Sequence, residues 1–449
     1  MLNSNELFQD SLQFATDASE RDNTPKVVDE LPAEANIADG EIFIIRNTTS
    51  RYLTHLFHKY AGKFIPHIPR WALRRFLRRN QEAVVLDPFV GSGTTLAEAL
   101  LYGQNSFGVD VDPLARLIAK VKTTVIPESR LWTLPEEVIE ALDRTTHGSY
   151  LPHIPTLSHW FNDQAVSDLS AIYEVVEKFR GEPDVYDFLL ICFSSIIRRA
   201  SNADNQTMKT YVSHTHPKQP EAARPLFVTT LKTYTDSLIK FGRLAPDNVR
   251  ATVMAADDAR TLDSVWREQG LPPVELGVTS PPYIKSVDYI YNQMAELFWI
   301  GERWGLETQA KQNAFKRKYI GNDRPSGGES QTMRTTGLGD VDEYISKVFE
   351  GNRSLALIMW RYFRDMEAHF AAIRSILRPG AHYIMVIGDS TLAGVPVPTH
   401  TLLTSCAQRC GFRFASQFAY EIRNKYMRFP RGGRGGVVVH DWVIDLVNE

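Results

Sequence analysis

The chain has 449 residues, of which 43% are hydrophobic and 23% charged, and its formal net charge is −3. This length suits one large domain with insertions or two to three ordinary domains, and the composition excludes collagen-like and low-complexity proteins. No stretch approaches the roughly 18 apolar residues of a membrane span, and the N-terminus lacks the order of a signal peptide, so we expect a cytoplasmic protein without membrane contact.

The first half of the chain predicts a parallel sheet. Residues 1–40 are polar and acidic and are predicted to form a flexible N-terminal arm. From residue 41 a turn-rich entry and a helix lead to a short apolar strand, a glycine loop at residues 87–95 and a helix that ends at Gly103. Residues 105–123 repeat the order of strand, acidic end and helix. Two such units in succession predict a doubly wound α/β sheet.

Two insertions interrupt this rhythm. Residues 125–245 hold four segments with helical apolar spacing and predict a helical insertion. The α/β rhythm then resumes, so residues 41–124 and 246–449 are predicted to form the core. Within the second part, residues 300–345 are irregular and form a candidate target-recognition insertion.

Acidic residues follow successive predicted strands. The loop "DPFVGSGTT" offers free backbone amides, but it has neither the lysine of a P-loop nor G-x-G-x-x-G spacing, and by itself it is equally a tight turn. Asp110 ends the next strand about 20 residues later, where a carboxylate accepts from ribose hydroxyls. Asp257 and Asp258 end a third strand, near the place of an adenine. Each aspartate alone is explained as a helix N-cap, whereas the ordered set favours an adenosine site.

A rigid corner, "TSPPY", closes the strand at residues 274–279. Ser280 offers a hydroxyl, Pro281 a carbonyl of defined direction, and Tyr283 an aromatic face. Two acceptors beside a ring suit an exocyclic amine on a base. A proline-ended strand without a ligand explains the corner equally well when it is taken alone.

Five motifs of this chain together resemble those of the S-adenosylmethionine-dependent DNA amino-methyltransferases, which make N4-methylcytosine and N6-methyladenine. They are "HKYAGKFIP" at residues 58–66, "DPFVGSGTT", "GVDVDP", "DDAR" and "TSPPY". The resemblance covers roughly residues 50–125 and 250–300 and implies a Rossmann-like methyltransferase fold with S-adenosyl-L-methionine as cofactor. It implies that the cofactor is bound by Lys63, Phe64, Asp87, Pro88, Phe89, Gly91, Ser92, Gly93, Thr94, Asp110, Asp257 and Asp258. It implies that the catalytic corner is Ser280, Pro281, Pro282 and Tyr283. The order of the motifs, cofactor part first, departs from the commonest arrangement for this glycine loop.

The predicted reaction is direct transfer of a methyl group to the exocyclic amine of a flipped base in double-stranded DNA. Methylation at ring carbon 5 would need a cysteine nucleophile, and no cysteine lies near the Pro-Pro corner. A Ser rather than an Asp or Asn before the prolines resembles the cytosine-N4 enzymes more than the adenine-N6 ones. Adenine N6, a guanine in transfer RNA, and a non-enzymatic nucleic-acid-binding protein are the alternatives.

Other features bear on partners. The three cysteines, with no Cys-x-x-Cys pair, support neither a disulfide framework nor a structural zinc site, and we predict no metal. Basic stretches at residues 69–80, 313–319 and 428–436 are predicted phosphate contacts, although each alone is better explained as a solvated helix face or a basic loop. A cognate restriction endonuclease is a possible partner, and the oligomeric state is left open.

Overall fold

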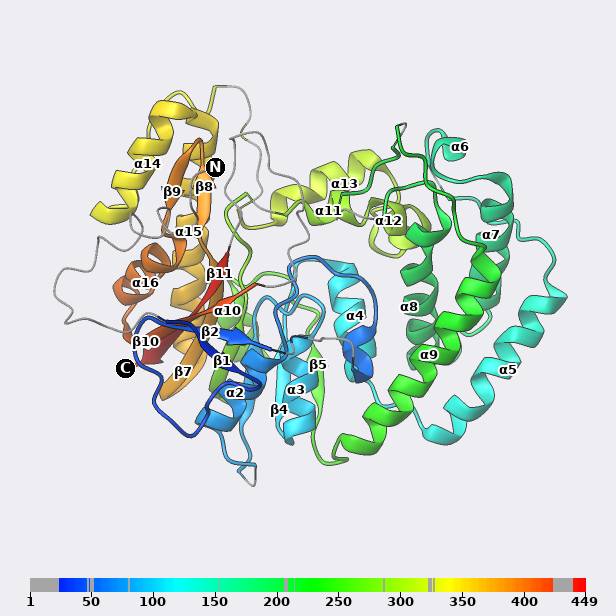
Figure 1. The fold of residues 1–449 in the computed structure, drawn as a ribbon, viewed down its shortest axis with the longest axis horizontal. Helices are drawn as coiled ribbons and strands as arrows, with labels where there is room; N and C mark the ends of the chain where they lie inside the picture. Colours follow the sequence, from blue (N-terminus) through cyan, green and yellow to red (C-terminus); the bar gives the residue numbers. More distant parts are fainter. Residues whose placement is uncertain are drawn as a thin grey trace.

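The computed structural model describes residues 24–46, 48, 52–79, 81–152, 154–205, 209–213, 215–285, 287–321, 325, 328–422 and 439–449. In this part of the chain nine strands form one sheet in the order β1-β2-β10-β11-β7-β6-β3-β4-β5 (Figure 1). The strands are β1 Lys26–Val28, β2 Glu41–Ile45, β3 Val84–Asp87, β4 Asn105–Gly108, β5 Ala251–Val253, β6 Val274–Thr279, β7 Leu377–Gly388, β10 Phe412–Glu421 and β11 His440–Asn448. A separate hairpin consists of β8 Ser390–Leu392 and β9 Val395–Val397.

The sheet is parallel except at β11, which runs antiparallel to both of its neighbours, β7 and β10. Every residue of β3 is buried, and β6 and β7 are also largely buried apolar runs. Such runs are typical of parallel strands that are covered on both faces. The predicted Rossmann-like, doubly wound fold is confirmed.

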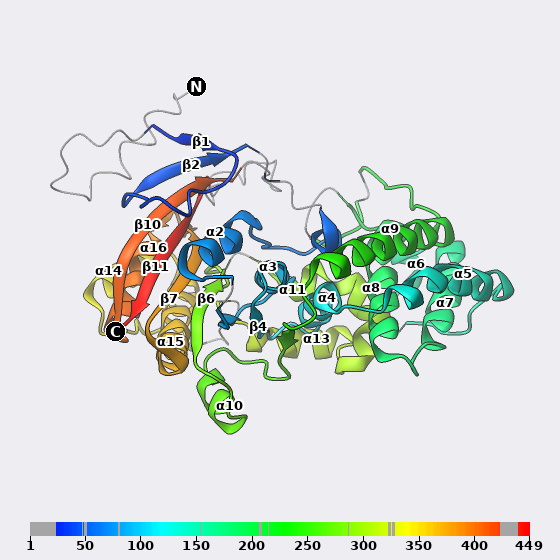
Figure 2. The ribbon, with the colours of Figure 1, turned by 90° about the horizontal axis from the view of Figure 1, so that it is seen from below.

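Helices cover both faces of the sheet, as Figure 2 shows. One face packs against α2 His67–Phe76 and α3 Thr94–Tyr102. The other face packs against α10 Leu262–Glu268, α14 Gly339–Gly351, α15 Arg353–Ile376 and α16 Thr399–Arg409. The strand ends, where parallel sheets of this class bind ligands, are left to the connecting loops.

A helical lobe lies beside the sheet, between β4 and β5 in the sequence (Figure 1). It consists of α5 Glu128–Arg144, α6 Leu157–Trp160, α7 Asp163–Glu177, α8 Pro183–Ala200 and α9 Ala223–Leu244. Its apolar core continues into α4 Pro113–Thr123, which follows β4, and into α12 Met294–Ile300. The lobe is therefore packed against the sheet domain through shared hydrophobic contacts.

The segment after β6 is built from short helices: α11 Tyr289–Asn292, α12, the 3₁₀ turn η2 Gly301–Trp304, α13 Gln309–Phe315 and the 3₁₀ turn η3 Lys316–Lys318. A further 3₁₀ turn, η1 Leu53–Leu56, precedes α2. Of the described helices, none combines the length and the apolarity that spanning a bilayer requires.

The N-terminal region differs from the predicted flexible arm. Residues 1–23 lie outside the described residues. Within residues 24–40, β1 pairs in parallel with β2, and the side chain of Leu31 is buried in the core beside α2. These residues are ordered because the edge of the sheet beyond β10 offers them a partner, which their polar sequence alone does not reveal.

Candidate active site

Eight of the sixteen predicted site residues line one cavity at the carboxyl ends of β3, β4, β5 and β6. We call it the strand-end cavity. The eight are Pro88, Phe89, Gly91, Asp110, Asp257, Asp258, Ser280 and Pro282. The cavity is partly open to solvent, and backbone from the glycine loop and from the Pro-Pro corner borders it. Residues predicted from the glycine loop and from the Pro-Pro corner thus share one space.

The glycine loop owes its shape to two left-handed glycines. Gly91 has φ +47° and Gly93 has φ +76°. A Cβ on Gly93 would lie 2.8 Å from the Cα of Ala119 in α4, so only glycine lets the loop pack against this helix. The amide of Gly91 donates to Asp110 Oδ2 at 2.8 Å. The loop after β3 is therefore tied to the end of β4.

Asp110 is a carboxyl group with a second acid, Asp112, close to it. Its Oδ1 accepts from the amide of Asp112 at 2.8 Å. Burial raises the pKa of Asp110, and the negative charge of Asp112 adds to the effect, so that the pKa reaches about 7 in spite of two backbone hydrogen bonds. A ligand that donates hydrogen bonds or carries positive charge would favour the ionised form of Asp110.

Asp87 lies behind the cavity and joins the two motifs. Its Oδ1 accepts from the Thr279 hydroxyl at 2.6 Å and from the Phe89 amide at 3.2 Å. Its Oδ2 is buried and has no hydrogen-bond partner among the described residues, and burial raises the pKa of Asp87 to about 6. Because Thr279 precedes Ser280, Asp87 fixes the glycine loop relative to the Pro-Pro corner.

Ion pairs hold the two acids after β5. Lys318 Nζ lies 3.2 Å from Asp257 Oδ2. Arg260 donates from Nε to Asp258 Oδ1 at 2.9 Å and also pairs with Asp365 at 3.0 Å. Both acids line the cavity, but each already has a cationic partner.

The Pro-Pro corner divides between the cavity and the core. Ser280 and Pro282 line the cavity, whereas Pro281 is buried. Tyr283 is half-buried, and its hydroxyl donates to Asp441 Oδ1 at 2.6 Å. The phenol is thus held by β11. Stacking of the Tyr283 ring on a base stays a prediction.

Comparison with known proteins finds similarity to DNA methyltransferases. The model of the N6/N4 DNA methylase family matches residues 50–120. The type II methyltransferase M.MvaI of Kocuria varians is 23% identical over 435 residues, 90% of this chain and 92% of that protein. The type II methyltransferase M.BsoBI of Geobacillus stearothermophilus is 21% identical over 379 residues, 73% of each chain. These matches support an amino-methyltransferase family of the N4-cytosine or N6-adenine type.

Among solved structures, the ribosomal RNA methyltransferase aviRa of Streptomyces viridochromogenes is similar to 87% of this amino-methyltransferase. The match covers 89% of that protein at 11% identity, with a TM-score of 0.29. At such a score the likeness decides nothing about the site.

S-adenosyl-L-methionine is the cofactor of this methyltransferase. It carries an ammonium group and a ribose with two hydroxyls, and two carboxylates of the site fit these donors. The unpartnered Oδ2 of Asp87 lacks a donor, and ionised Asp110 is disfavoured until a donor or cation approaches. These two carboxylates are the expected partners of the ammonium group and of the ribose hydroxyls, respectively.

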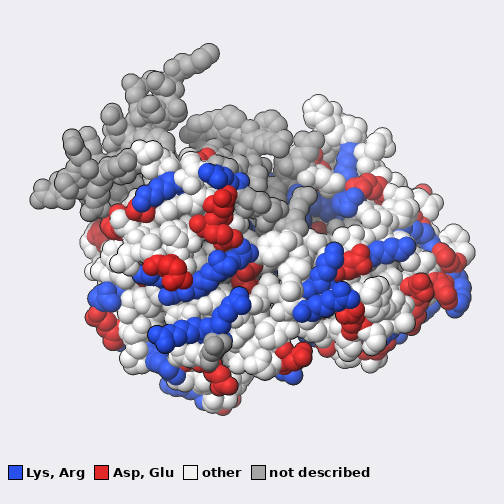
Figure 3. Space-filling model, turned by 60° about the horizontal axis from the view of Figure 1, so that its bottom comes forward, with Lys and Arg blue, Asp and Glu red and all other residues white. Residues whose placement is uncertain are grey.

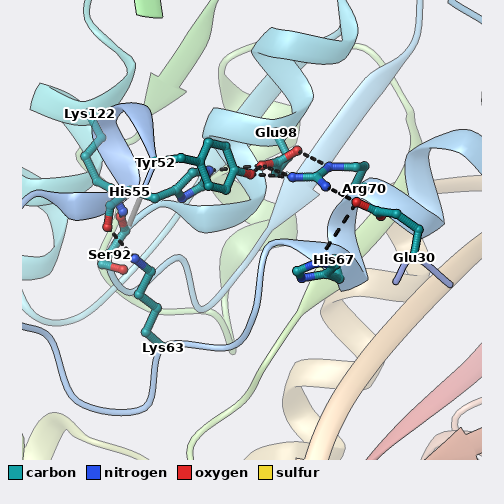
Figure 4. Close-up of polar contacts among 9 residues, drawn as sticks. All are labelled: Glu30, Tyr52, His55, Lys63, His67, Arg70, Ser92, Glu98 and Lys122. Carbon is teal, nitrogen blue, oxygen red and sulfur yellow. Dashed lines mark hydrogen bonds and ion pairs between the residues drawn. The ribbon is translucent and has the colours of Figure 1, made fainter. Parts of the chain in front are cut away.

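Besides Asp87 and Gly93, four predicted cofactor residues lie outside the lining of the strand-end cavity. Thr94 is buried at the start of α3. Phe64 is buried in the apolar core beside α2, where its ring fills space under the sheet. Lys63 Nζ donates to the carbonyl of His55 at 2.5 Å. The Ser92 carbonyl accepts from Lys122 Nζ at 2.6 Å (Figure 4). The prediction that these side chains touch the cofactor has no direct support in the geometry, since packing places them behind the loop.

A buried polar network, which sequence reasoning missed, supports the loop from behind (Figure 4). Glu98 on α3 accepts from His55 Nε2 at 3.0 Å, from Arg70 Nε at 3.2 Å and from the Tyr52 hydroxyl. Burial alone would raise the pKa of Glu98, but the hydrogen bonds and charges of His55 and Arg70 lower it to about 2. The network joins α2, α3 and the η1 segment into one support.

Aromatic residues that the sequence did not single out form one wall of the cavity. Tyr60, Tyr289 and Tyr319 line it. The ring centroids of Tyr60 and Tyr289 are 5.6 Å apart, and those of Tyr289 and Tyr319 are 5.9 Å apart, both stacked. A Cβ on Gly62 would lie 2.8 Å from the Tyr289 hydroxyl. The tyrosines in "HKYAG" and "DYIYN" were the available signal, but nothing local brings them together.

Some residues of the basic stretches are engaged in ion pairs. Arg70 pairs with Glu98 and Glu30, and Lys316 pairs with Asp288. The stretch at residues 428–436 lies outside the described residues. On the face drawn in Figure 3, rows of basic side chains have acidic side chains beside them. Phosphate contact by these stretches stays a prediction.

Proposed function

We propose that the chain transfers a methyl group from S-adenosyl-L-methionine to the exocyclic N4 amine of cytosine in double-stranded DNA. The observation that carries the proposal is that Ser280 and Pro282 line the same cavity as Gly91 and Asp110. The residues suited to an amine and those suited to the methyl donor therefore border one space. The match of the DNA methylase family supports DNA as the substrate.

The corner activates the amine by hydrogen bonding. An aromatic amine is a poor nucleophile because its lone pair is delocalised into the ring. The Ser280 hydroxyl and the Pro281 carbonyl accept its two hydrogens and draw it toward tetrahedral geometry. The cofactor supplies an activated methyl group. Cys192 and Cys406 are buried, and neither they nor Cys410 lines the cavity, so the described residues offer no cysteine nucleophile for a route through ring carbon 5.

The base reaches the corner by leaving the duplex. A methyl acceptor within a base stack is inaccessible to a cavity at the strand ends, and extrusion costs a few kcal/mol. Tyr283 offsets part of this cost by stacking. We assign base reading to residues 300–345 rather than to residues 125–245, on their glycines and mixture of basic and aromatic residues. The type II names of the relatives support a restriction-modification role with a cognate endonuclease.

The test is product analysis. The protein is incubated with genomic DNA and methyl-labelled S-adenosyl-L-methionine, and the DNA is digested to nucleosides for mass spectrometry. We expect labelled N4-methylcytosine from the wild type and none from Ser280→Ala, with cofactor binding retained. Ser264→Ala, at an exposed position on α10, is the matched control and keeps full activity. N6-methyladenine would replace the cytosine assignment by the adenine one, and no methylated nucleoside would refute both.

A further inference from the structure

A second cavity, of about 810 Å³, lies between the sheet domain and the helical lobe, and we call it the lobe cavity. Its walls include Lys59 from the segment before α2, Ser195 and Arg198 from α8, and Gln293 and Glu296 at the start of α12. Residues 58, 59 and 61 line the lobe cavity, whereas residues 60 and 62 line the strand-end cavity. One extended segment therefore borders both spaces.

Two residues that line the lobe cavity each carry a buried acceptor atom without a partner among the described residues. Glu296 and Gln293 are each 6% exposed, and Glu296 Oε2 and Gln293 Oε1 have no hydrogen-bond partner among the described residues. The amide of Gln293 is oriented by its Nε2, which donates to Asp112 Oδ2 at 2.8 Å, so its oxygen is the atom left over. A buried acceptor without a donor is costly, which points to a ligand that brings the donors.

The charge around these acceptors limits the ligand. Burial raises the pKa of Glu296, while the positive charges of Arg198 and Lys59 act in the opposite direction. An anionic ligand would meet two unpartnered oxygens, and a polyamine would meet two cations. Lys59 and Arg198 already donate to backbone carbonyls, so a neutral group that presents N–H donors to Glu296 and Gln293 fits these charges.

A nucleobase has this pattern on its Watson–Crick edge. Guanine is the DNA base that places two N–H groups, N1–H and the 2-amino group, beside a carbonyl acceptor, O6. Glu296 and Gln293 are three residues apart at the start of one helix, a spacing that puts side chains on the same face. Two acceptors on one face match two donors on one edge.

We infer that the lobe cavity is a nucleobase pocket that binds the Watson–Crick edge of guanine through Glu296 and Gln293. The source of the guanine rests on the proposed function: when a cytosine leaves the duplex for the Pro-Pro corner, its guanine partner is left unpaired. The lobe cavity then holds the second base of the opened pair and stabilises the extruded state of the first.

The inference is tested by calorimetric titration of the full chain with deoxynucleoside monophosphates, at saturating S-adenosyl-L-methionine so that the strand-end cavity is filled. We expect dGMP to bind, dIMP, which lacks the 2-amino group, to bind at least fivefold more weakly, and dAMP to give no saturable binding. Glu296→Gln should weaken dGMP binding at least tenfold. Its thermal midpoint should stay the same or rise, since a buried unpartnered carboxylate is replaced by a neutral amide.

Ser195→Ala is the matched control, because Ser195 lines the same cavity but donates its hydroxyl to the Cys192 carbonyl at 2.9 Å. It should bind dGMP as the wild type does. Equal affinity of the wild type for dGMP and dAMP, no dGMP binding at millimolar concentration, or unchanged affinity in Glu296→Gln would each overturn the inference. If Glu296→Gln fails to fold, the comparison of dGMP with dAMP on the wild type decides alone.

The two proposals fail separately. Absence of any methylated nucleoside refutes the proposed function but leaves the dGMP titration readable. Methylation of DNA by a protein that does not bind dGMP refutes the pocket alone. In the active enzyme, Glu296→Gln should raise the KM for genomic DNA at least tenfold and leave the KM for S-adenosyl-L-methionine unchanged.

Discussion

Replacing Asp110 by Asn should weaken cofactor binding and remove most of its pH dependence. The carboxylate accepts from the amides of Gly91 and Asp112, and we assign the ribose hydroxyls to the same group. With its pKa near 7, about ten of eleven molecules carry an ionised Asp110 at pH 8 and about one in eleven at pH 6. Because the ionised form is the better acceptor, acidification from pH 8 to pH 6 should raise the Kd of wild type about tenfold.

At pH 8, Asp110→Asn loses a charged acceptor worth about 1.5 to 3 kcal/mol, which corresponds to a Kd about 10- to 150-fold higher. Between pH 6 and pH 8 the Kd of the variant should change by only about twofold, which is the contribution of Asp87 with its pKa of about 6. The measurement is calorimetric titration with S-adenosyl-L-methionine, with thermal unfolding to confirm that the variant is folded. Asp263→Asn is the control, because Asp263 on α10 is paired with Arg267 and does not line the cavity. A flat wild-type profile, or equal affinity in the wild type and Asp110→Asn, would refute the assignment.

Three further substitutions test the support of the site. Gly93→Ala should lower the free energy of unfolding in urea by at least about 2 kcal/mol, because of the left-handed backbone and the contact with α4. Gly270→Ala, which has the same left-handed backbone but open space around it, should lower it by about 1 kcal/mol. Equal losses of stability in the two variants would contradict the packing argument. Lys122→Met removes the donor to the Ser92 carbonyl, so the Kd for S-adenosyl-L-methionine should rise about fivefold in calorimetry, and an unchanged Kd would exclude a positioning role. Tyr283→Phe keeps the ring and loses only the hydrogen bond to Asp441 on β11, so its turnover should stay within about tenfold of the wild type. Tyr283→Ala removes the ring and should abolish turnover. Equal effects of the two variants on turnover would exclude stacking.

The central strands and the strand-end acids were readable from the sequence because each signal is local. Apolar runs that end in acids, glycines or prolines predict the strands β3, β4 and β6, and parallel strands bring their carboxyl ends to one edge. Asp110, Gly91 and Ser280 lie in one cavity for this reason. The local pattern of each stretch was enough to predict these site residues, because the parallel sheet brings the ends of its strands together.

Other features depend on packing between distant segments, which local patterns do not encode. Lys63 and Phe64 lie in a stretch that resembles a cofactor motif, yet their side chains are taken up by a backbone carbonyl and by the core. Tyr289 and Tyr319 reach the cavity only because the short helices after β6 fold back against it. The strand β1 is three residues long, too short for a periodicity to be detected.

The bond between Asp87 and Thr279 joins strands that are far apart in the sequence. β3 and β6 are neighbours in the sheet, paired at Val85 with Leu276, yet the whole helical lobe lies between them in the chain. The spacing between the glycine loop and the Pro-Pro corner is therefore set by the pairing of β3 with β6. It does not depend on the length of the chain between these strands. The helical lobe can therefore change in size or sequence while the distance over which a methyl group must travel stays the same.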